Sequence, residues 1–368
     1  EEGTEEYSGR HTDRSAAPLG RRAFFLSTLV GSRAIGSCRP MAEFDQLPIE
    51  VSERLGLSGT RLVPMPGDAS SRRYARVDHP DFGPALLLVD TPGTPHFDNF
   101  LLIGAHLADL GFSAPRIFAA LPEAGVALIE DFGDAIYTNL LREGADERAL
   151  YDQAVDTLIA LHTNASSIDI DLPHYDMERL LEEVGRFADW FAPVIRPGLP
   201  ERFVSSHTAL LREALAGPAS RRDALVLRDY HVDNLLLLED RSGPARCGLL
   251  DFQDGLIGAR AYDLVSLTQD ARRDLSPGLE KRCLDRYLAA APDSDAFLTD
   301  YWRLGAQRHA KIAGNFQRLS RRDGKHQYLA YLPRVLRLLD QALTQAGLDE
   351  IKDLYDSTLP GWTSWTPG

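Results

Sequence analysis

Two stretches decide the fold of this chain: Leu227-Arg228-Asp229-Tyr230-His231-Val232-Asp233-Asn234 and Leu250-Asp251-Phe252-Gln253-Asp254. An apolar run at residues 224–227 leads into the first stretch, where an Asn stands five residues after the Asp. A second apolar run then ends in Asp-Phe, seventeen residues after that Asn. Both runs are short, which predicts buried strands that each deliver polar side chains into a loop.

These polar side chains suit phosphoryl transfer to a hydroxyl group. Asp229 can orient the acceptor hydroxyl and accept its proton, and Asn234 and Asp251 can hold Mg²⁺ against nucleotide phosphates. Mg²⁺ is a hard cation, and phosphate and water fill most of its coordination sites, so few protein ligands are needed. The alternative is a polar turn between two buried strands, as in many α/β proteins. The spacing of the motifs and the N-terminal half of the chain favour a kinase.

Length and composition indicate an ordinary globular protein. A chain of 368 residues with 44% apolar and 26% charged residues can form one two-lobed domain or two small ones. The net charge of −14 argues against sequence-independent binding of nucleic acid, which needs a basic face. The first lysine is Lys281, so phosphate contacts in the N-terminal half must come from arginine, backbone amides or magnesium. Three separated cysteines, Cys38, Cys247 and Cys283, favour a reducing cytoplasm over a disulfide framework or a zinc site.

The N-terminal segment is expected to lie outside the fold. Arg21-Arg22-Ala23-Phe24-Phe25-Leu26 resembles a twin-arginine export signal, but Arg33 interrupts the apolar segment, which is too short and too charged to span a membrane. Residues 1–40 have the composition of a disordered extension, and Met41 begins an amphipathic segment. No membrane span is expected in the chain, and the predicted location is the cytoplasm.

Residues 41–133 are predicted to form a small β-rich lobe that binds the nucleotide. Strands are expected at residues 61–65, 73–77, 85–90, 116–120 and 126–130, and a helix at 97–110. The turn-forming segment Pro66-Gly67-Asp68-Ala69-Ser70-Ser71 joins the first two strands and can lay its backbone amides over phosphates. The loop after Glu130 is the expected hinge, where backbone groups meet adenine.

Residues 134–350 are predicted to form a larger, mostly helical lobe with the catalytic loop, the metal site and the acceptor site. Apolar residues recur there at three- and four-residue spacing in several segments. Helices are expected at residues 147–162, 177–191, 202–214, 261–273, 277–290, 296–319 and 327–346. Residues 351–368 are interpreted as a C-terminal tail.

Together these features resemble the aminoglycoside-phosphotransferase-like kinases and, within them, the anomeric kinases of N-acetylmuramate and N-acetylglucosamine of bacterial cell-wall recycling. Further motifs that carry the resemblance are Gly67-Asp68-Ala69-Ser70-Ser71-Arg72-Arg73-Tyr74, Tyr262-Asp263-Leu264-Val265-Ser266-Leu267 and Arg322-Asp323-Gly324-Lys325. The resemblance implies an α+β, two-lobed protein-kinase-like fold. It also implies transfer of phosphate from ATP, with Mg²⁺, to the anomeric hydroxyl of a small-molecule amino sugar. The oligomeric state stays open.

The resemblance assigns roles to single residues. Asp229 would be the catalytic base, and Asn234 and Asp251 would bind the metal. Asp263 would brace the catalytic loop from the helix that follows. The residues that would contact the nucleotide are Ser70, Ser71, Arg73 and Glu130.

One departure from the wider superfamily concerns the third strand, Leu86-Leu87-Leu88-Val89-Asp90. It has no lysine where protein kinases and antibiotic kinases place one against the phosphates. This difference argues against phosphorylation of antibiotics and favours the sugar-kinase branch. Two alternatives stay open: transfer to an aminoglycoside or another small alcohol, and a nucleotide-binding regulatory module without activity. The complete set of Asp229, Asn234 and Asp251 argues against the silent module.

Candidates for sugar contacts come from three further segments. Glu183, Phe187 and Trp190 share one face of the helix at 177–191, where a ring can stack on a sugar and a carboxylate can accept from its hydroxyls. The alternative is that the rings belong to the core and Glu183 to the solvated surface. The other candidates are His231, Asp254 and Lys325. Lys325 ends a basic run that is either a solvated face or a site for the lactyl carboxylate of N-acetylmuramate. The run comprises Lys311, Arg318, Arg321, Arg322 and Lys325.

Overall fold

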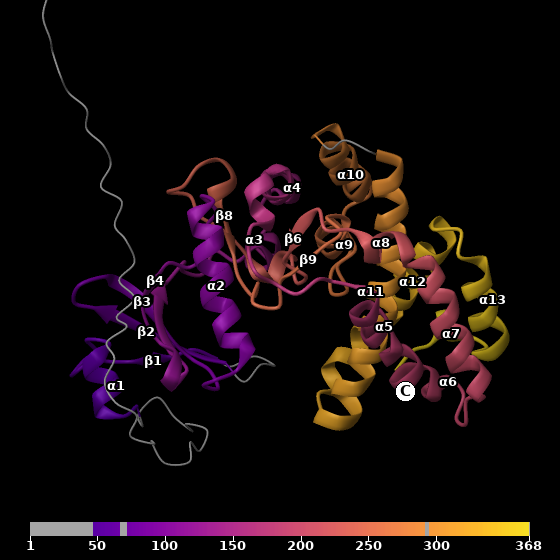
Figure 1. Cartoon of the computed structure of the whole chain (residues 1–368), viewed down its shortest axis with the longest axis horizontal. Coiled ribbons are helices and arrows are strands. Elements are labelled where there is room, and N and C mark those ends of the chain that lie inside the picture. Colours follow the sequence, from indigo (N-terminus) through magenta and orange to yellow (C-terminus); the bar gives the residue numbers. More distant parts are fainter. Residues whose placement is uncertain (1–46, 67–71, 291–293, 368) are drawn as a thin grey trace, which may run out of the picture.

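The chain folds into two lobes (Figure 1), which an isolated β-bridge between Ser113 and Gly248 joins. The computed structural model describes residues 47–66, 72–290 and 294–367, so the extension predicted at residues 1–40 lies outside it. The N-terminal lobe is an antiparallel five-stranded sheet in the order β1-β2-β3-β5-β4. The strands are β1 (Val63–Pro64), β2 (Arg73–His79), β3 (Gly83–Val89), β4 (Ile117–Leu121) and β5 (Val126–Glu130). All five predicted strands are confirmed, with small shifts at their ends.

Apolar side chains on both sides of β3 bury this sheet from two directions. Leu87 packs into a small core with the segment around α1 (Ile49–Arg54), and Leu88 joins the main core together with α2 (Pro95–Asp109). A strand that is apolar on successive residues is expected where both faces are covered. After α2 the chain reverses at Gly111, whose φ of 86° is the left-handed conformation typical of a glycine that follows a helix.

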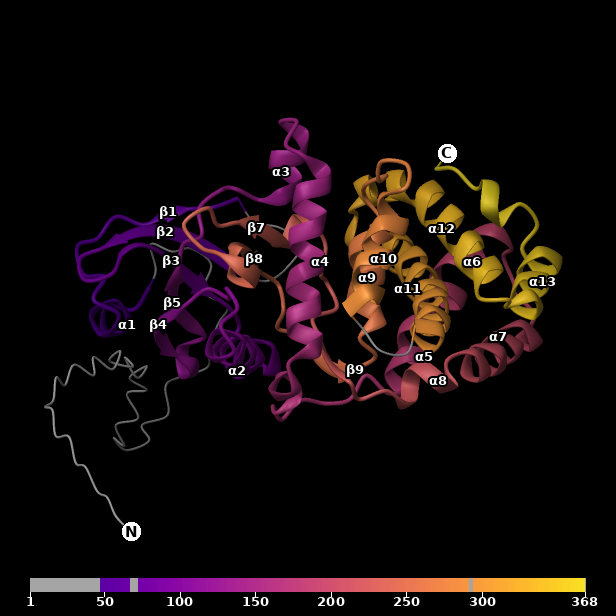
Figure 2. The same ribbon diagram turned by 90° about the horizontal axis from the view of Figure 1, so that it is seen from above.

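The C-terminal lobe is mostly helical, and two short two-stranded sheets carry its loops. Strand β6 (Ala224–Val226) pairs with β9 (Leu256–Gly258), and β7 (Leu235–Leu237) pairs with β8 (Cys247–Leu249). The helices are α3 (Tyr137–Arg142), α4 (Glu147–Thr163), α5 (Met177–Arg186), α6 (Ala192–Ile195), α7 (Glu201–Ala214), α8 (Ala216–Ser220), α9 (Ala261–Thr268), α10 (Leu279–Ala290), α11 (Ser294–Asp323), α12 (Leu332–Gln345) and α13 (Asp349–Thr358). Figure 2 shows α4 between the sheet and the group formed by α9 to α13. Within the described residues, none of these helices is long and apolar enough to cross a membrane.

Two helices are shorter than the sequence pattern suggests. Helix α9 ends at Thr268 instead of near residue 273, because Gln269 leaves the helical conformation and its side chain bonds His309 and Glu280. The predicted helix at 327–346 starts as a 3₁₀ turn and becomes α-helical only at Leu332. For α9, side-chain bonds across the fold accompany an end that the apolar spacing does not predict.

The segment interpreted as a C-terminal tail, residues 351–368, contains a helix that packs on the lobe. Helix α13 packs against α7 and α12, and Ile351 and Tyr355 are buried in these contacts. Trp362 beyond the helix is 1% exposed. The pattern is hard to recognise in sequence because a helix of this length shows the core only two apolar side chains, four residues apart.

Candidate active site

The catalytic loop leaves regular structure at Arg228, directly before the candidate base. The φ of Arg228 is 71°, in the left-handed region where residues with a Cβ are strained. The carboxylate of Asp263, on α9, accepts the backbone N–H groups of Leu227 and Arg228 at 2.7 Å each. Ser266 and Arg308 each donate to the carbonyl of Arg228 at 3.1 Å. These bonds hold the strained turn in place, and they confirm the bracing role predicted for Asp263.

Asp229 follows this turn with 43% of its side chain exposed. A guanidinium nitrogen of Arg308, on α11, lies 4.0 Å from its Oδ1. Partial burial acts to raise the pKa of Asp229, but Arg308, followed by His231 and Lys311, lowers it below its ordinary value. The side chain is therefore a carboxylate at neutral pH and can accept a hydrogen bond from a hydroxyl group.

The loop after β8 returns to the catalytic loop and brings a second carboxylate with it. The N–H of Leu250 donates to the carbonyl of Asn234 at 3.0 Å, and Asn234 Nδ2 donates to the carbonyl of Asp229 at 2.9 Å. The amide oxygen of Asn234 thus remains as the atom for a cation. Burial and the charges of Asp229 and Asp254 raise the pKa of Asp251. A bound cation would offset both effects, so this pair of oxygen donors fits Mg²⁺.

A buried arginine connects the two lobes next to Asp251. Arg72, 4% exposed, donates to Oδ2 of Asp90 at 2.9 Å and to Oε1 of Gln253 at 2.6 Å. Gln253 in turn donates to Oδ1 of Asp251 at 2.6 Å. The backbone carbonyl of His96, at the start of α2, also accepts from Arg72. We call Arg72, Asp90, His96 and Gln253 the Arg72 cluster.

The Arg72 cluster puts a cation beside the third strand, which has no lysine. Sequence reasoning selected the next residue, Arg73, which begins β2 and is partly exposed. Both arginines lie in one motif, so the sequence did indicate an arginine at this position of the lobe. Strand residues alternate between the two faces of a sheet, and only the pairing of β2 with β3 decides which arginine faces inward.

The remaining residues expected at the nucleotide are less informative. Ser70 and Ser71 lie outside the described residues. Glu130 ends β5, and its carboxylate accepts from the Arg241 guanidinium and, at 3.2 Å, from the Arg116 N–H. The side chain of Glu130 is thus bonded to its neighbours, so the groups at the hinge that can contact a nucleotide are those of the backbone.

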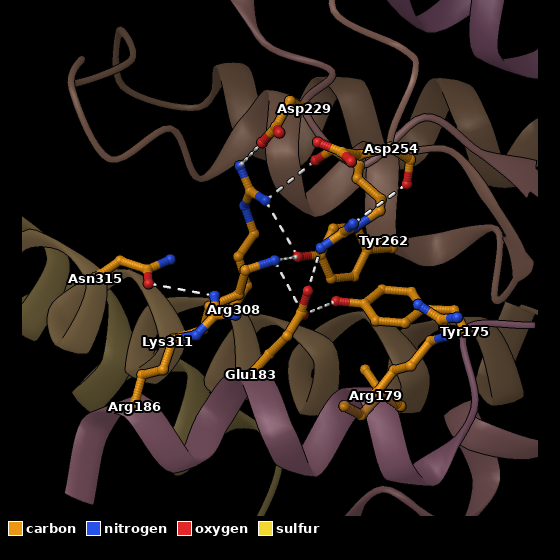
Figure 3. A network of polar contacts seen from close by, with 12 residues as sticks. Tyr175, Arg179, Glu183, Arg186, Asp229, Asp254, Tyr262, Arg308, Lys311 and Asn315 are labelled. Atoms are coloured by element: carbon orange, nitrogen blue, oxygen red, sulfur yellow. Dashed lines mark hydrogen bonds and ion pairs between the residues drawn. The ribbon is translucent and has the colours of Figure 1, made fainter. Parts of the chain in front are cut away.

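A second buried acid lies on α5 (Figure 3). Glu183 is 7% exposed and forms ion pairs with Arg228 and, at 3.0 Å, with Lys311. It also accepts the hydroxyl of Tyr175. Burial alone would raise the pKa of Glu183, but Lys311 and Arg228 lower it to about 2. We call Glu183, Arg228, Lys311 and Tyr175 the Glu183 cluster. Glu183 is not solvated, and its two oxygens are not both free to contact a sugar, because they bind Arg228 and Lys311.

A cavity of about 320 Å³ opens beside the Glu183 cluster. This volume is at the lower end of the range for small-molecule sites. Its walls come from α5, the catalytic loop and the segment after Asp251. The lining residues are Arg179, Glu182, Glu183, Arg186, Arg228, Asp254 and Leu256. The structure therefore brings together two of the predicted sugar contacts, Glu183 and Asp254.

The other predicted sugar contacts lie outside the lining of this cavity. His231 is 6% exposed, burial lowers its pKa, and its Nδ1 has no hydrogen-bond partner within the described part of the chain. Lys325 comes after the end of α11. Phe187 is fully buried and stacks on Tyr355, so the core interpretation holds for this ring. Trp190 is partly exposed and does not line the cavity either.

Known proteins resemble this chain over most of its length. Residues 61–298 match the family described as "Phosphotransferase enzyme family". The chain is 36% identical to the N-acetylmuramate/N-acetylglucosamine kinase of Caulobacter vibrioides, over 83% of this chain and 94% of that protein. It is 34% identical to the protein of the same name from Pseudomonas aeruginosa, over 82% of this chain and 89% of that protein.

Solved structures show the same architecture at low sequence identity. The ADP-bound aminoglycoside phosphotransferase APH(2'')-Ib gives a TM-score of 0.54 at 13% identity and covers 82% of this chain and 99% of its own. A choline/ethanolamine kinase family protein from Mesorhizobium loti gives a TM-score of 0.54 at 13% identity, with coverage of 82% and 94%. These likenesses confirm the predicted two-lobed kinase-like fold. With the match over residues 61–298 and the curated relatives, the chain belongs to the phosphotransferase enzyme family.

Proposed function

We propose that the protein transfers the γ-phosphoryl group of ATP to the anomeric hydroxyl of N-acetylmuramate or N-acetylglucosamine, as a step of cell-wall recycling. The observation that carries the proposal is the position of Asp229, an ionised carboxylate in a braced loop next to the cavity of about 320 Å³. The names of the relatives from Caulobacter vibrioides and Pseudomonas aeruginosa supply the acceptor.

In this reaction Asp229 would accept a hydrogen bond from the anomeric hydroxyl and align its oxygen with the phosphorus. A carboxylate with a lowered pKa is a weak base, so its main contribution would be alignment, with the proton leaving late. Arg308, at 4.0 Å, would keep the carboxylate ionised. The strained turn at Arg228 would fix the direction of the side chain.

Asn234 and Asp251 would hold Mg²⁺. The described residues contain no group of three or more His, Cys, Asp or Glu side chains arranged to bind a metal by themselves. A site at Asn234 and Asp251 therefore suits an ion that takes its other ligands from phosphate and water. When bound, such an ion neutralises negative charge on the phosphates.

On the nucleotide side, the proposal uses the segment before β2 and the hinge. Backbone amides with Ser70 and Ser71 would lie over the phosphates, and Arg73 would neutralise part of their charge. The backbone after Glu130 would contact adenine. The neighbouring Arg72 would act indirectly, because its bond to Gln253 supports the residue that holds Asp251.

On the acceptor side, Asp254 would accept from a sugar hydroxyl, and Arg228, held by Glu183, would donate to one. His231 would support the catalytic loop, and Lys325 would contact the acceptor only at its edge. The cavity lining has three arginines and three acids, so it lacks the acidic excess that would favour a polycationic aminoglycoside.

The test is a ³¹P NMR spectrum of the protein with ATP, Mg²⁺ and, in separate tubes, N-acetylmuramate, N-acetylglucosamine and kanamycin. A sugar 1-phosphate signal, coupled to the anomeric proton, is expected with at least one of the two amino sugars. Phosphorylated kanamycin without sugar phosphate would assign the protein to antibiotic phosphorylation instead. Binding of ATP without a product in any tube would contradict the proposed reaction.

A further inference from the structure

Three arginines make no ion pair with any residue that the structure describes: Arg179 and Arg186, which line the cavity, and Arg318 on α11. Arg186 has one polar side-chain contact, from Nη1 to Oδ1 of Asn315 at 3.3 Å (Figure 3). The Nε of Arg318 is buried and has no hydrogen-bond partner within the described part of the chain. Elsewhere in the site, by contrast, each cation is matched with a carboxylate, as Arg228 and Lys311 are with Glu183.

Arg186 and Arg318 come from α5 and α11, two helices that pack together, and the charge of Arg186 acts on the pKa of Arg318. Lys311, Asn315 and Arg318 are four and three residues apart on α11, so they share one side of that helix. Lys311 bonds Glu183, and Asn315 bonds Arg186 one turn further along both helices. Arg318 lies one more turn along this side of α11.

The charge of this pair is only partly balanced, because Asp323, the carboxylate that acts on Arg318, is already paired with Arg322. Burial and the neighbouring guanidiniums of Arg322 and Arg186 lower the pKa of Arg318. The acid closest to Arg322 is Asp323, which forms an ion pair with it at 2.7 Å. Glu182 also lines the cavity, but its side chain is exposed to solvent and forms no ion pair with any residue in the described part of the chain. The site therefore has room for an anion.

The backbone fixes Arg186 closely against α11. A Cβ at Gly314 would lie 2.2 Å from the carbonyl oxygen of Arg186, so only glycine allows this approach. Directly after Arg186 the helix widens into a π-helical turn at Phe187–Phe191, a feature that often occurs at functional sites. Arg186 thus comes from a rigid part of the lobe, whereas Arg179 lies two turns earlier with an exposed side chain.

We propose that Arg186 and Arg318 form a subsite for a carboxylate on the acceptor sugar, which in N-acetylmuramate is the lactyl group. The inference rests on the proposed function and adds the origin of preference between the two amino sugars. N-Acetylglucosamine has no carboxylate and would leave the subsite to water.

The rise along α11 between the residues that contact Asp229 and Arg186 is comparable with the size of one sugar. Arg308 lies 4.0 Å from Asp229, and Asn315, which bonds Arg186, is seven residues further along the helix. Seven residues of α-helix span about 10 Å. That is the width of a monosaccharide ring with a hydrogen bond at each end, as required if the C1 hydroxyl meets Asp229 and the C3 ether points to Arg186.

The experiment compares three neutralising variants, Arg186→Gln, Arg318→Gln and the control Arg321→Gln, on both sugars. Arg321 is an exposed cation on the same helix and does not line the cavity. The KM for N-acetylmuramate should rise about 10- to 100-fold in the first two variants, because a charge-assisted bond is lost. The KM for N-acetylglucosamine should stay within about twofold in all three, and the control should leave both sugars unaffected.

A second acceptor separates charge from shape. The methyl ester of N-acetylmuramate is neutral, so the wild-type protein should use it with a KM raised to the level of the Arg186→Gln variant. In that variant, acid and ester should then become equal. Equal losses on both amino sugars, or no change with N-acetylmuramate, would overturn the subsite while turnover of N-acetylglucosamine keeps the kinase assignment. Failure of the wild-type protein to phosphorylate either sugar would overturn the proposed function itself.

Discussion

The Arg72 cluster and the Glu183 cluster, the two buried groups of charges near Asp229, balance charge in different ways. The Arg72 cluster sets one guanidinium against one carboxylate, Asp90, and adds a neutral acceptor, Gln253, from the other lobe. The Glu183 cluster sets two cations against one carboxylate. The first is a closed, neutral connection between lobes, suited to positioning. The second keeps positive charge at the wall of a cavity, suited to holding an anionic or hydroxyl-bearing acceptor.

The Glu183 cluster lies beside Asp229 and the Arg72 cluster beside Asp251. Removal of the charge of Asp229 should have the largest effect. We expect Asp229→Asn to lower kcat by about 10³-fold, because alignment and proton acceptance are lost. The thermal unfolding midpoint should change little, since Asp263 still braces the loop. Initial rates with N-acetylglucosamine measure the effect, with Asp240→Asn, an exposed site, as control. A rate within tenfold of the wild type would remove Asp229 from the chemistry.

The difference in charge balance predicts a difference in stability between two neutralised acids. Glu183→Gln leaves two buried cations without their carboxylate and should lower the free energy of unfolding by about 3–5 kcal/mol. Asp90→Asn removes the carboxylate beside Arg72 and His96, but Arg72 keeps Gln253 and the carbonyl of His96, so the change should cost about 1–3 kcal/mol. Urea unfolding measures both, with Glu182→Gln as a matched control that should change stability by less than about 0.5 kcal/mol. Equal costs for the two variants would contradict the comparison.

The lowered pKa of the Glu183 carboxylate predicts how the free energy of unfolding depends on pH. The pKa of Glu183 is lowered to about 2 in the folded protein, so its stabilising contribution is complete above the unfolded pKa of about 4.3. It is lost as the pH falls from about 4.5 toward 2, because the unfolded state binds the proton first. The gap in unfolding free energy between wild type and Glu183→Gln should shrink by about 3 kcal/mol over this range. A gap that stays constant between pH 5 and pH 2.5 would show that Glu183 is not held by its cations.

The smallest effect is expected for a change that keeps the charge of the Arg72 cluster. Arg72→Lys preserves the ion pair with Asp90 but loses the fork that also reaches Gln253. We expect kcat/KM for ATP to fall about tenfold while the KM for the sugar stays unchanged. Arg54→Lys, at an exposed ion pair with Glu123, serves as control. A larger change in the KM for the sugar than in kcat/KM for ATP would show that Arg72 supports the acceptor site and not the nucleotide site.

Local patterns in the sequence were enough for the fold and for the placement of the catalytic motifs. Asp229 and Asp251 each follow a short apolar strand. The apolar spacing of the longer helices is regular enough to be recognised in the sequence alone. The same holds for Asp263, whose motif places it on the helix after the metal loop. These features depend on neighbours close in the chain, which a single sequence displays.

The tertiary structure alone decided which charged residues act together. Arg72 and Gln253 are 181 residues apart, and Glu183 and Lys311 come from two helices that face each other only in the folded lobe. Nothing in the spacing distinguishes Arg72 from Arg73, or Lys311 from the exposed Arg321. Burial makes the difference, because a charge removed from water must find its partner across the fold, and that partner is set by packing and not by sequence order.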